Sequence, residues 1–187
     1  LSCGSTLDHL QIREGERILD LGCGRGEDTL LAADLVGRTG TAVGLDLTEA
    51  MILAARTNAA AIGTSNAVFV LGDIEALPFA DASFDGVTSN CVINHARDKG
   101  RVYREINRVL RQGGRFVISD AVTKVPLPEQ VKQDPEAWAQ CYGGAVTEEE
   151  YFQQIKHAGF PSIEILSRRE YLKNGFDFIS LTIRAVK

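Results

Sequence analysis

The 187-residue sequence has no apolar run near the roughly 18–20 residues that a membrane-spanning helix needs. It also lacks a stripe of basic residues, since 25 acidic and 20 basic side chains give a formal charge of −5. Non-specific phosphate binding depends on clustered Lys and Arg, so nucleic acid is not an expected partner. No charged segment followed by an apolar stretch opens the chain, and we therefore expect no secretion signal. With 44% apolar and 24% charged residues, the composition predicts an ordinary globular domain away from membranes.

Cysteine is scarce, and its spacing excludes two common uses. The four cysteines are Cys3, Cys23, Cys91 and Cys141. No two of them form a Cys-x-x-Cys pair, which argues against a zinc ribbon or a thioredoxin-like redox site. We predict no bound metal ion. Without a secretion signal, the thiols are expected to be reduced and the protein cytoplasmic.

Short apolar segments alternate with longer segments of helical spacing in the first two thirds of the chain. The predicted strands are Arg17–Leu21, Thr41–Leu45, Ala67–Leu71, Phe84–Ser89 and Arg115–Asp120. The predicted helices between them are Asp28–Leu35, Glu49–Ala61 and Lys99–Leu110. This alternation predicts an α/β fold with a doubly wound, mostly parallel sheet covered by helices on both faces.

The last third of the chain has a different pattern. We expect a helix over about 136–141, and the capping-box sequence from Thr147 to Glu150 predicts another that ends near Gly159. Two further strands, Ser162–Leu166 and Asp177–Val186, would form a C-terminal antiparallel hairpin and bring the sheet to seven strands. No linker divides the chain. We predict one domain over 1–187, with an N-terminal lid (1–15), a cofactor-binding core (16–122) and substrate-side helices with the last two strands (123–187).

Glycine or aspartate follows three successive predicted strands. The first strand leads through Asp20 into the glycine-rich loop Gly22–Gly26, the second ends at Asp46, and the third ends at Gly72 and Asp73. Ligands bind at the carboxyl ends of parallel strands, where glycine lets the backbone approach them closely and a carboxylate can accept hydrogen bonds from ribose hydroxyls. The spacing is not that of the Gly-x-Gly-x-x-Gly dinucleotide loop, which makes a nicotinamide-dependent enzyme the weaker alternative.

The residues at these strand ends resemble those of the class I S-adenosylmethionine-dependent methyltransferases. The resemblance extends over nearly the whole chain. The resemblance implies a Rossmann-like fold and S-adenosyl-L-methionine as cofactor. It implies that Asp20 and the loop hold the amino-acid part of the cofactor and that Asp46 binds the ribose. The resemblance also implies that further residues contact the adenine or another part of the cofactor: Leu47, Met51, Gly72, Asp73, Ile74 and Asn90. Within the loop, the implied residues are Gly22, Cys23, Gly24 and Gly26.

Three cysteine contexts narrow the resemblance. Cys3 lies in a Cys-Gly pair before the first strand, Cys91 in Ser-Asn-Cys-Val-Ile-Asn, and Cys141 in Trp-Ala-Gln-Cys-Tyr-Gly-Gly-Ala. These contexts resemble the arsenite methyltransferases. The resemblance implies that Cys3, Cys91 and Cys141 are the catalytic thiolates that bind trivalent arsenic, a soft centre that selects sulfur ligands. The arsenic lone pair would then take the methyl group without a general base, since it has no proton to lose.

The resemblance implies arsenite, delivered as a thiol conjugate, as the small-molecule substrate and a thiol reductant as a second partner. Two departures bear on it: Thr29 stands where many members have a cysteine, and His95 stands where they have leucine. We therefore keep two alternatives. One is a methyltransferase acting on an organic O, N, C or S acceptor, for which His95 would be the candidate base. The other is a metalloid-binding protein without turnover.

Overall fold

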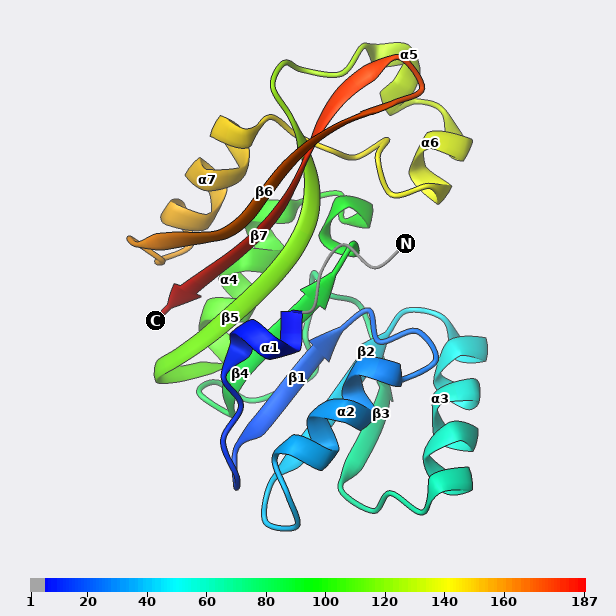
Figure 1. Cartoon of the computed structure of the whole chain (residues 1–187), viewed down its shortest axis with the longest axis vertical. Helices are drawn as coiled ribbons and strands as arrows, with labels where there is room; N and C mark the ends of the chain where they lie inside the picture. The colour runs from blue at the N-terminus through cyan, green and yellow to red at the C-terminus, as the bar shows by residue number, and fades with distance from the viewer. Residues whose placement is uncertain (1–5) are drawn as a thin grey trace.

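A seven-stranded sheet forms the centre of the structure, a computed structural model that describes residues 6–187 (Figure 1). Across the sheet, the strands are β3 (Ala67–Leu71), β2 (Thr41–Asp46), β1 (Arg17–Leu21), β4 (Phe84–Asn90), β5 (Leu110–Thr123), β7 (Phe176–Val186) and β6 (Ile163–Lys173). From β3 to β5 neighbouring strands are parallel, whereas β7 pairs antiparallel with both β5 and β6. The strand order reverses between β1 and β4, and the carboxyl ends of these two strands therefore lie side by side.

Helices cover both faces of the sheet. They are α1 (Thr6–Leu10), α2 (Glu27–Leu35), α3 (Glu49–Ile62), α4 (Lys99–Val109), α5 (Glu129–Lys132), α6 (Pro135–Ala139) and α7 (Glu148–His157), with a 3₁₀ turn η1 at Ile93–His95. On one face, Leu10 of α1 and Val36 after α2 are buried against Ile18 of β1. On the other face, α4 and α7 bury their apolar side chains against β4 and β5. None of the helices in residues 6–187 is long and apolar enough to cross a bilayer.

The predicted fold class is confirmed. All seven predicted strands are present, and the final two form the predicted hairpin, whose turn has positive φ at Asn174 and Gly175. The strands β5 and β6 run further than predicted because each pairs with β7 beyond the end of the parallel sheet, as far as Thr123 and Lys173. The short helices α1 and α5 were not predicted, since four or five residues carry no helical period of their own.

A buried ion pair joins the start of the chain to the middle of the sheet. Arg115 of β5 and Glu16 before β1 form two N–O contacts of 2.7 Å, and their side chains are only 9% and 15% exposed. The Arg115 guanidinium also donates to the carbonyls of Leu10, Gln11 and Asp85. Since these contacts use all its N–H donors, Arg115 fixes α1 and β1 against β5 and β4.

Removing one partner of this buried pair should be costly. We expect Arg115→Met to lower the free energy of unfolding by about 3–5 kcal/mol, because Glu16 is left as an uncompensated buried charge. The matched control is Arg104→Met, since Arg104 pairs with Asp98 at 3.4 Å with both side chains more than half exposed, and we expect its cost to stay under about 1 kcal/mol. Equal midpoints in chemical denaturation for the two variants would contradict this ranking.

Candidate active site

The carboxyl ends of β1 and β4 meet where the strand order reverses. Gly22, directly after β1, has φ +69°, and a Cβ on it would collide with the side chain of Val92. Gly26 has φ +88°, and its Cβ would lie 2.8 Å from the ring of Phe69. Only glycine suits both positions, because each combines left-handed backbone with contact against a packed side chain. The loop therefore passes close to the segment after β4 and to β3.

Asp20 lies in β1 with its side chain turned under this loop. It is 4% exposed and accepts a 2.6 Å hydrogen bond from the hydroxyl of Thr29, which stands where many members of the family have a cysteine. Burial, with smaller contributions from the neighbouring carboxylates Asp28 and Asp46, raises the pKa of Asp20 to about 7, although the hydrogen bond from Thr29 opposes the shift. Near neutral pH this carboxyl group is thus poised between its two protonation states.

Asp46 ends β2 with its carboxylate held by the backbone. One oxygen accepts from the N–H of Gly24 and the other from the N–H of Thr48, both at 2.9 Å. Each oxygen keeps one further lone pair. Asp46 lines a cavity of about 930 Å³, so those lone pairs are available to a ligand with two neighbouring hydroxyls.

Two cavities hold most of the residues predicted to bind the cofactor. The cavity of about 930 Å³, here the cofactor cavity, is lined among others by Gly22, Asp46, Leu47, Asp73, Ile74, Asn90, Cys91 and Cys141. A smaller cavity of about 380 Å³ is lined by Asp20, Gly22, Cys23, Asn90 and three charged neighbours. Gly22 and Asn90 border both. The other four predicted residues, Gly24, Gly26, Met51 and Gly72, line neither cavity.

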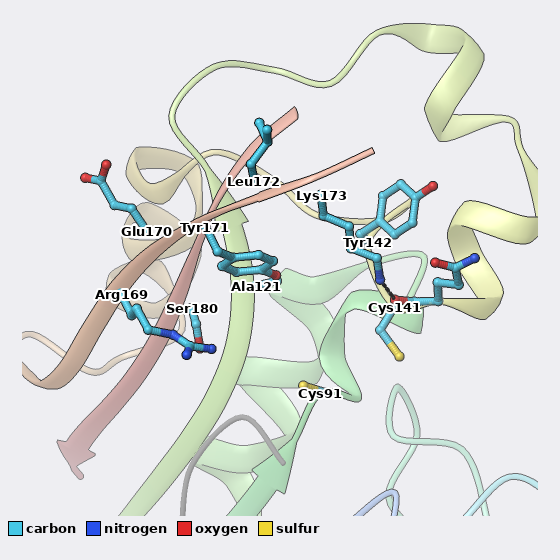
Figure 2. Close-up of a pocket in the computed structure, with 11 residues that line it drawn as sticks. Cys91, Ala121, Cys141, Tyr142, Arg169, Glu170, Tyr171, Leu172, Lys173 and Ser180 are labelled. Atoms are coloured by element: carbon cyan, nitrogen blue, oxygen red, sulfur yellow. Dashed lines mark hydrogen bonds between the residues drawn. The ribbon is translucent and has the colours of Figure 1, made fainter. Parts of the chain in front are cut away.

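Cys91 and Cys141 lie at the junction of the cofactor cavity with a third cavity of about 660 Å³. Figure 2 shows Cys91 directly after β4 and Cys141 on the loop after α6, both on the same side of this cavity. Both residues have positive φ, 57° and 64°. The side chain of Asn94 donates to the carbonyls of Cys141 and Ala121, and so ties the loop of Cys141 to β5.

The protonation of this pair follows from its surroundings. Cys141 is a free thiol whose pKa is raised by burial and by the nearby Asp120 carboxyl, although Lys173 opposes the shift. His95 Nε2 lies 3.0 Å from the Sγ of Cys141, and burial lowers its pKa. A neutral imidazole therefore faces a protonated thiol at neutral pH. Cys91 is disulfide-bonded, so the expectation that the thiols are reduced is wrong for this residue, and only reduction would free its sulfur for a ligand.

The remaining two cysteines differ in their relation to the site. Cys23 is 8% exposed, and burial raises the pKa of its thiol to about 12, so it is an unreactive neighbour of the glycine loop. Cys3, which was predicted as a third sulfur ligand, lies outside the described residues.

Sequence reasoning missed the hairpin side of the site. Arg169, Tyr171 and Lys173 of β6 line the third cavity across from the two cysteines (Figure 2). Their alternating positions show that they share one face of a strand, but nothing in the sequence indicates which structure that face meets. His95 was considered only as a candidate base, and its contact with Cys141 was not predicted.

Comparison with known proteins decides the family. A methyltransferase domain family matches residues 12–159. The crystal structure of an arsenic(III) S-adenosylmethionine methyltransferase from Chlamydomonas reinhardtii is similar over 100% of this chain and 68% of that chain, with 35% identity and a TM-score of 0.90. The chain belongs to the arsenite methyltransferase family.

Curated arsenite methyltransferases are similar as well. That of Halobacterium salinarum is 43% identical over 91% of this chain and 44% of its own length. That of the mouse is 38% identical over 77% of this chain and 40% of its own length. The chain thus spans less than half the length of these curated relatives. The predicted family and its cofactor, S-adenosylmethionine, are confirmed.

The raised pKa of Cys141 predicts slow alkylation at neutral pH. Because the thiolate is the nucleophile, the rate of iodoacetamide labelling at Cys141 should reach half its maximum at a pH above that of an ordinary cysteine, for which free cysteine is the reference. Peptide mass spectrometry across a pH series separates Cys141 from the other cysteines, and Cys141→Ser confirms the peptide. A midpoint at or below that of free cysteine would show that burial does not dominate at this thiol.

Proposed function

We propose that this chain transfers a methyl group from S-adenosylmethionine to trivalent arsenic bound by Cys91 and Cys141, with Cys3 as the third sulfur ligand. The observation that carries the proposal is the position of Cys91 and Cys141 at the junction of two cavities. One cavity has the residues suited to the cofactor, and the other is lined by the same two cysteines. An arsenic atom bound to these two sulfurs would be accessible from both cavities.

The residues of the cofactor cavity suit S-adenosylmethionine. The free lone pairs of Asp46 fit the two ribose hydroxyls, and Leu47 and Ile74 offer apolar contact to a flat base beside the carboxylate of Asp73. Asp20 supplies a buried carboxyl group for the ammonium of the amino-acid end. The cofactor supplies an electrophilic methyl group on a positively charged sulfur.

The substrate side requires little more than positioning. Thiolates select soft centres such as trivalent arsenic, and binding replaces the proton on each thiol. His95, neutral and 3.0 Å from Cys141, is placed to accept that proton. Since the arsenic lone pair carries no proton, the protein need only hold it in line with the methyl group. A thiol reductant is part of the proposal, because Cys91 is disulfide-bonded.

The experiment that tests the activity is the formation of S-adenosylhomocysteine on adding arsenite with excess thiol. We expect turnover in the parent chain and a loss of at least about 100-fold in Cys91→Ser and in Cys141→Ser, since a hydroxyl is a poor ligand for a soft centre. Cofactor binding by calorimetry is the control and should be unchanged in both variants. Turnover that survives in both would favour an organic acceptor, and arsenite binding without turnover would favour the metalloid-binding alternative.

Cofactor binding should release a proton from Asp20. Its pKa of about 7 means that the carboxyl is mostly protonated at pH 6 and mostly ionised at pH 8. A cationic ligand favours the ionised form, so the affinity for S-adenosylmethionine should be about tenfold weaker at pH 6 than at pH 8. Titrations at the two values of pH measure this ratio.

The matched control for that titration is a second buried carboxyl group. Asp120 also has its pKa raised by burial, to about 8, but lines none of the cavities assigned to the cofactor. Asp20→Asn should abolish the tenfold ratio, whereas Asp120→Asn should keep it. A ratio that persists in Asp20→Asn would assign the linked proton to another group.

A further inference from the structure

The third cavity, here the hairpin cavity, is large for the ligand that the proposed function requires. Its volume is about 660 Å³, within the range of about 300–1,000 Å³ typical of sites for organic ligands. Cys91 and Cys141 occupy one side, and β6 with the loop after α6 forms the rest. An arsenic atom on the two sulfurs would leave most of this space empty. The cavity thus has room for an organic group carried by the arsenic.

The charged residues that line this cavity are not balanced: in the described part of the chain its cations form no ion pair, whereas its anion is paired elsewhere. Arg169 and Lys173 reach it from the same face of β6, and neither forms an ion pair within residues 6–187. Lys173 donates to the carbonyl of Gln140 at 3.3 Å and keeps two further N–H donors. Glu170 is the acidic residue of the lining, but its carboxylate already pairs with Lys124 at 2.6 Å and with Arg168 at 2.9 Å.

Figure 2 shows how these side chains are directed. Glu170 points away from the two cysteines, whereas Arg169 and Lys173 point to the side on which the cysteines lie. Between them, the half-buried ring of Tyr171 stacks on Phe178 with a centroid distance of 5.7 Å and offers a flat wall. Two cations thus flank an aromatic surface that faces the sulfur ligands.

We propose that the hairpin cavity binds a carboxylate-bearing organic substituent on the trivalent arsenic, with Arg169 and Lys173 as the residues that select its charge. The inference rests on the proposed function, since Cys91 and Cys141 must hold the arsenic. With such a substrate the organic substituent takes the third bond of the trivalent arsenic, in the place that Cys3 takes when the substrate is arsenite. A guanidinium favours a planar carboxylate through paired hydrogen bonds, and an ammonium adds a second charge. The preferred substrate would be an arsenical conjugated to an anionic thiol or aryl group rather than to a neutral one.

Arylarsine oxides test this inference without any methyl transfer. An arylarsine oxide condenses with two thiols to form two As–S bonds and releases its oxygen, with the two thiol protons, as one water. The probes are phenylarsine oxide, its 4-carboxy derivative and its 4-aminomethyl derivative. The protein is first reduced with a phosphine, which is then removed. Trp138, the single tryptophan of the chain, lies three residues before Cys141 and gives a fluorescence readout.

In the parent chain, the 4-carboxy probe should bind about tenfold more tightly than the neutral probe, and the 4-aminomethyl probe more weakly than either. The dissociation constants are measured in competition with a small dithiol. Arg169→Gln and Lys173→Gln should each reduce the carboxy preference to about threefold, and the double variant should abolish it. Lys156→Gln on the exposed surface of α7 removes the same charge away from the cavity and should leave the preference unchanged.

The outcomes distinguish failure of the charge selection from failure of the two-sulfur site. Equal affinity of the parent chain for the three probes, or a preference that survives in the double variant, would overturn the charge selection and leave the thiol pair intact. No binding of any probe would overturn the two-sulfur site, and this inference with it.

Discussion

The passage of Gly22 beside Val92 is the contact on which the rest of the site depends. It brings the loop after β1 against the segment after β4, and both segments border the cofactor cavity. A side chain at position 22 would push them apart, separating Asp20 and Asp46 from Cys91. Since the strand order reverses between β1 and β4, no other pair of strand ends in the parallel sheet diverges to leave such a space.

Burial is used differently at the two ends of the site. At the predicted cofactor end, it raises the pKa of the Asp20 carboxyl to about 7, so that a bound cation would favour its ionised form. At the proposed substrate end, it raises the pKa of the Cys141 thiol, which lies beside a neutral imidazole. Arg169 and Lys173 come from the hairpin and line the cavity of about 660 Å³ on the other side of the two cysteines. Cations are not confined to that side, since Arg97 and Arg25 line the two cavities predicted to hold the cofactor.

The local sequence pattern was enough to predict the strands and the glycine loop. A buried parallel strand appears in the sequence as a short apolar run, whichever elements pack against it. It was also enough to single out Cys91 and Cys141, whose sequence contexts are distinctive. It failed for α1, whose five residues are helical only because Leu7 and Leu10 pack into the core. It failed again for the extension of β6, since residues 167–173 are strand only because they pair with β7. In both cases a distant partner supplies the stabilisation that local propensity lacks.

The sequence by itself determined the alternation of strands and helices, the positions that require glycine and the acidic residues at the strand ends, because these follow from backbone sterics and from the burial of short apolar runs. Only the tertiary structure decided which distant residues meet. The contact of His95 with Cys141, and the position of Arg169 and Lys173 across from the two cysteines, depend on how the loop after α6 and the C-terminal hairpin fold over the sheet edge. That packing brings together residues 28 to 82 positions apart, over which no local periodicity extends.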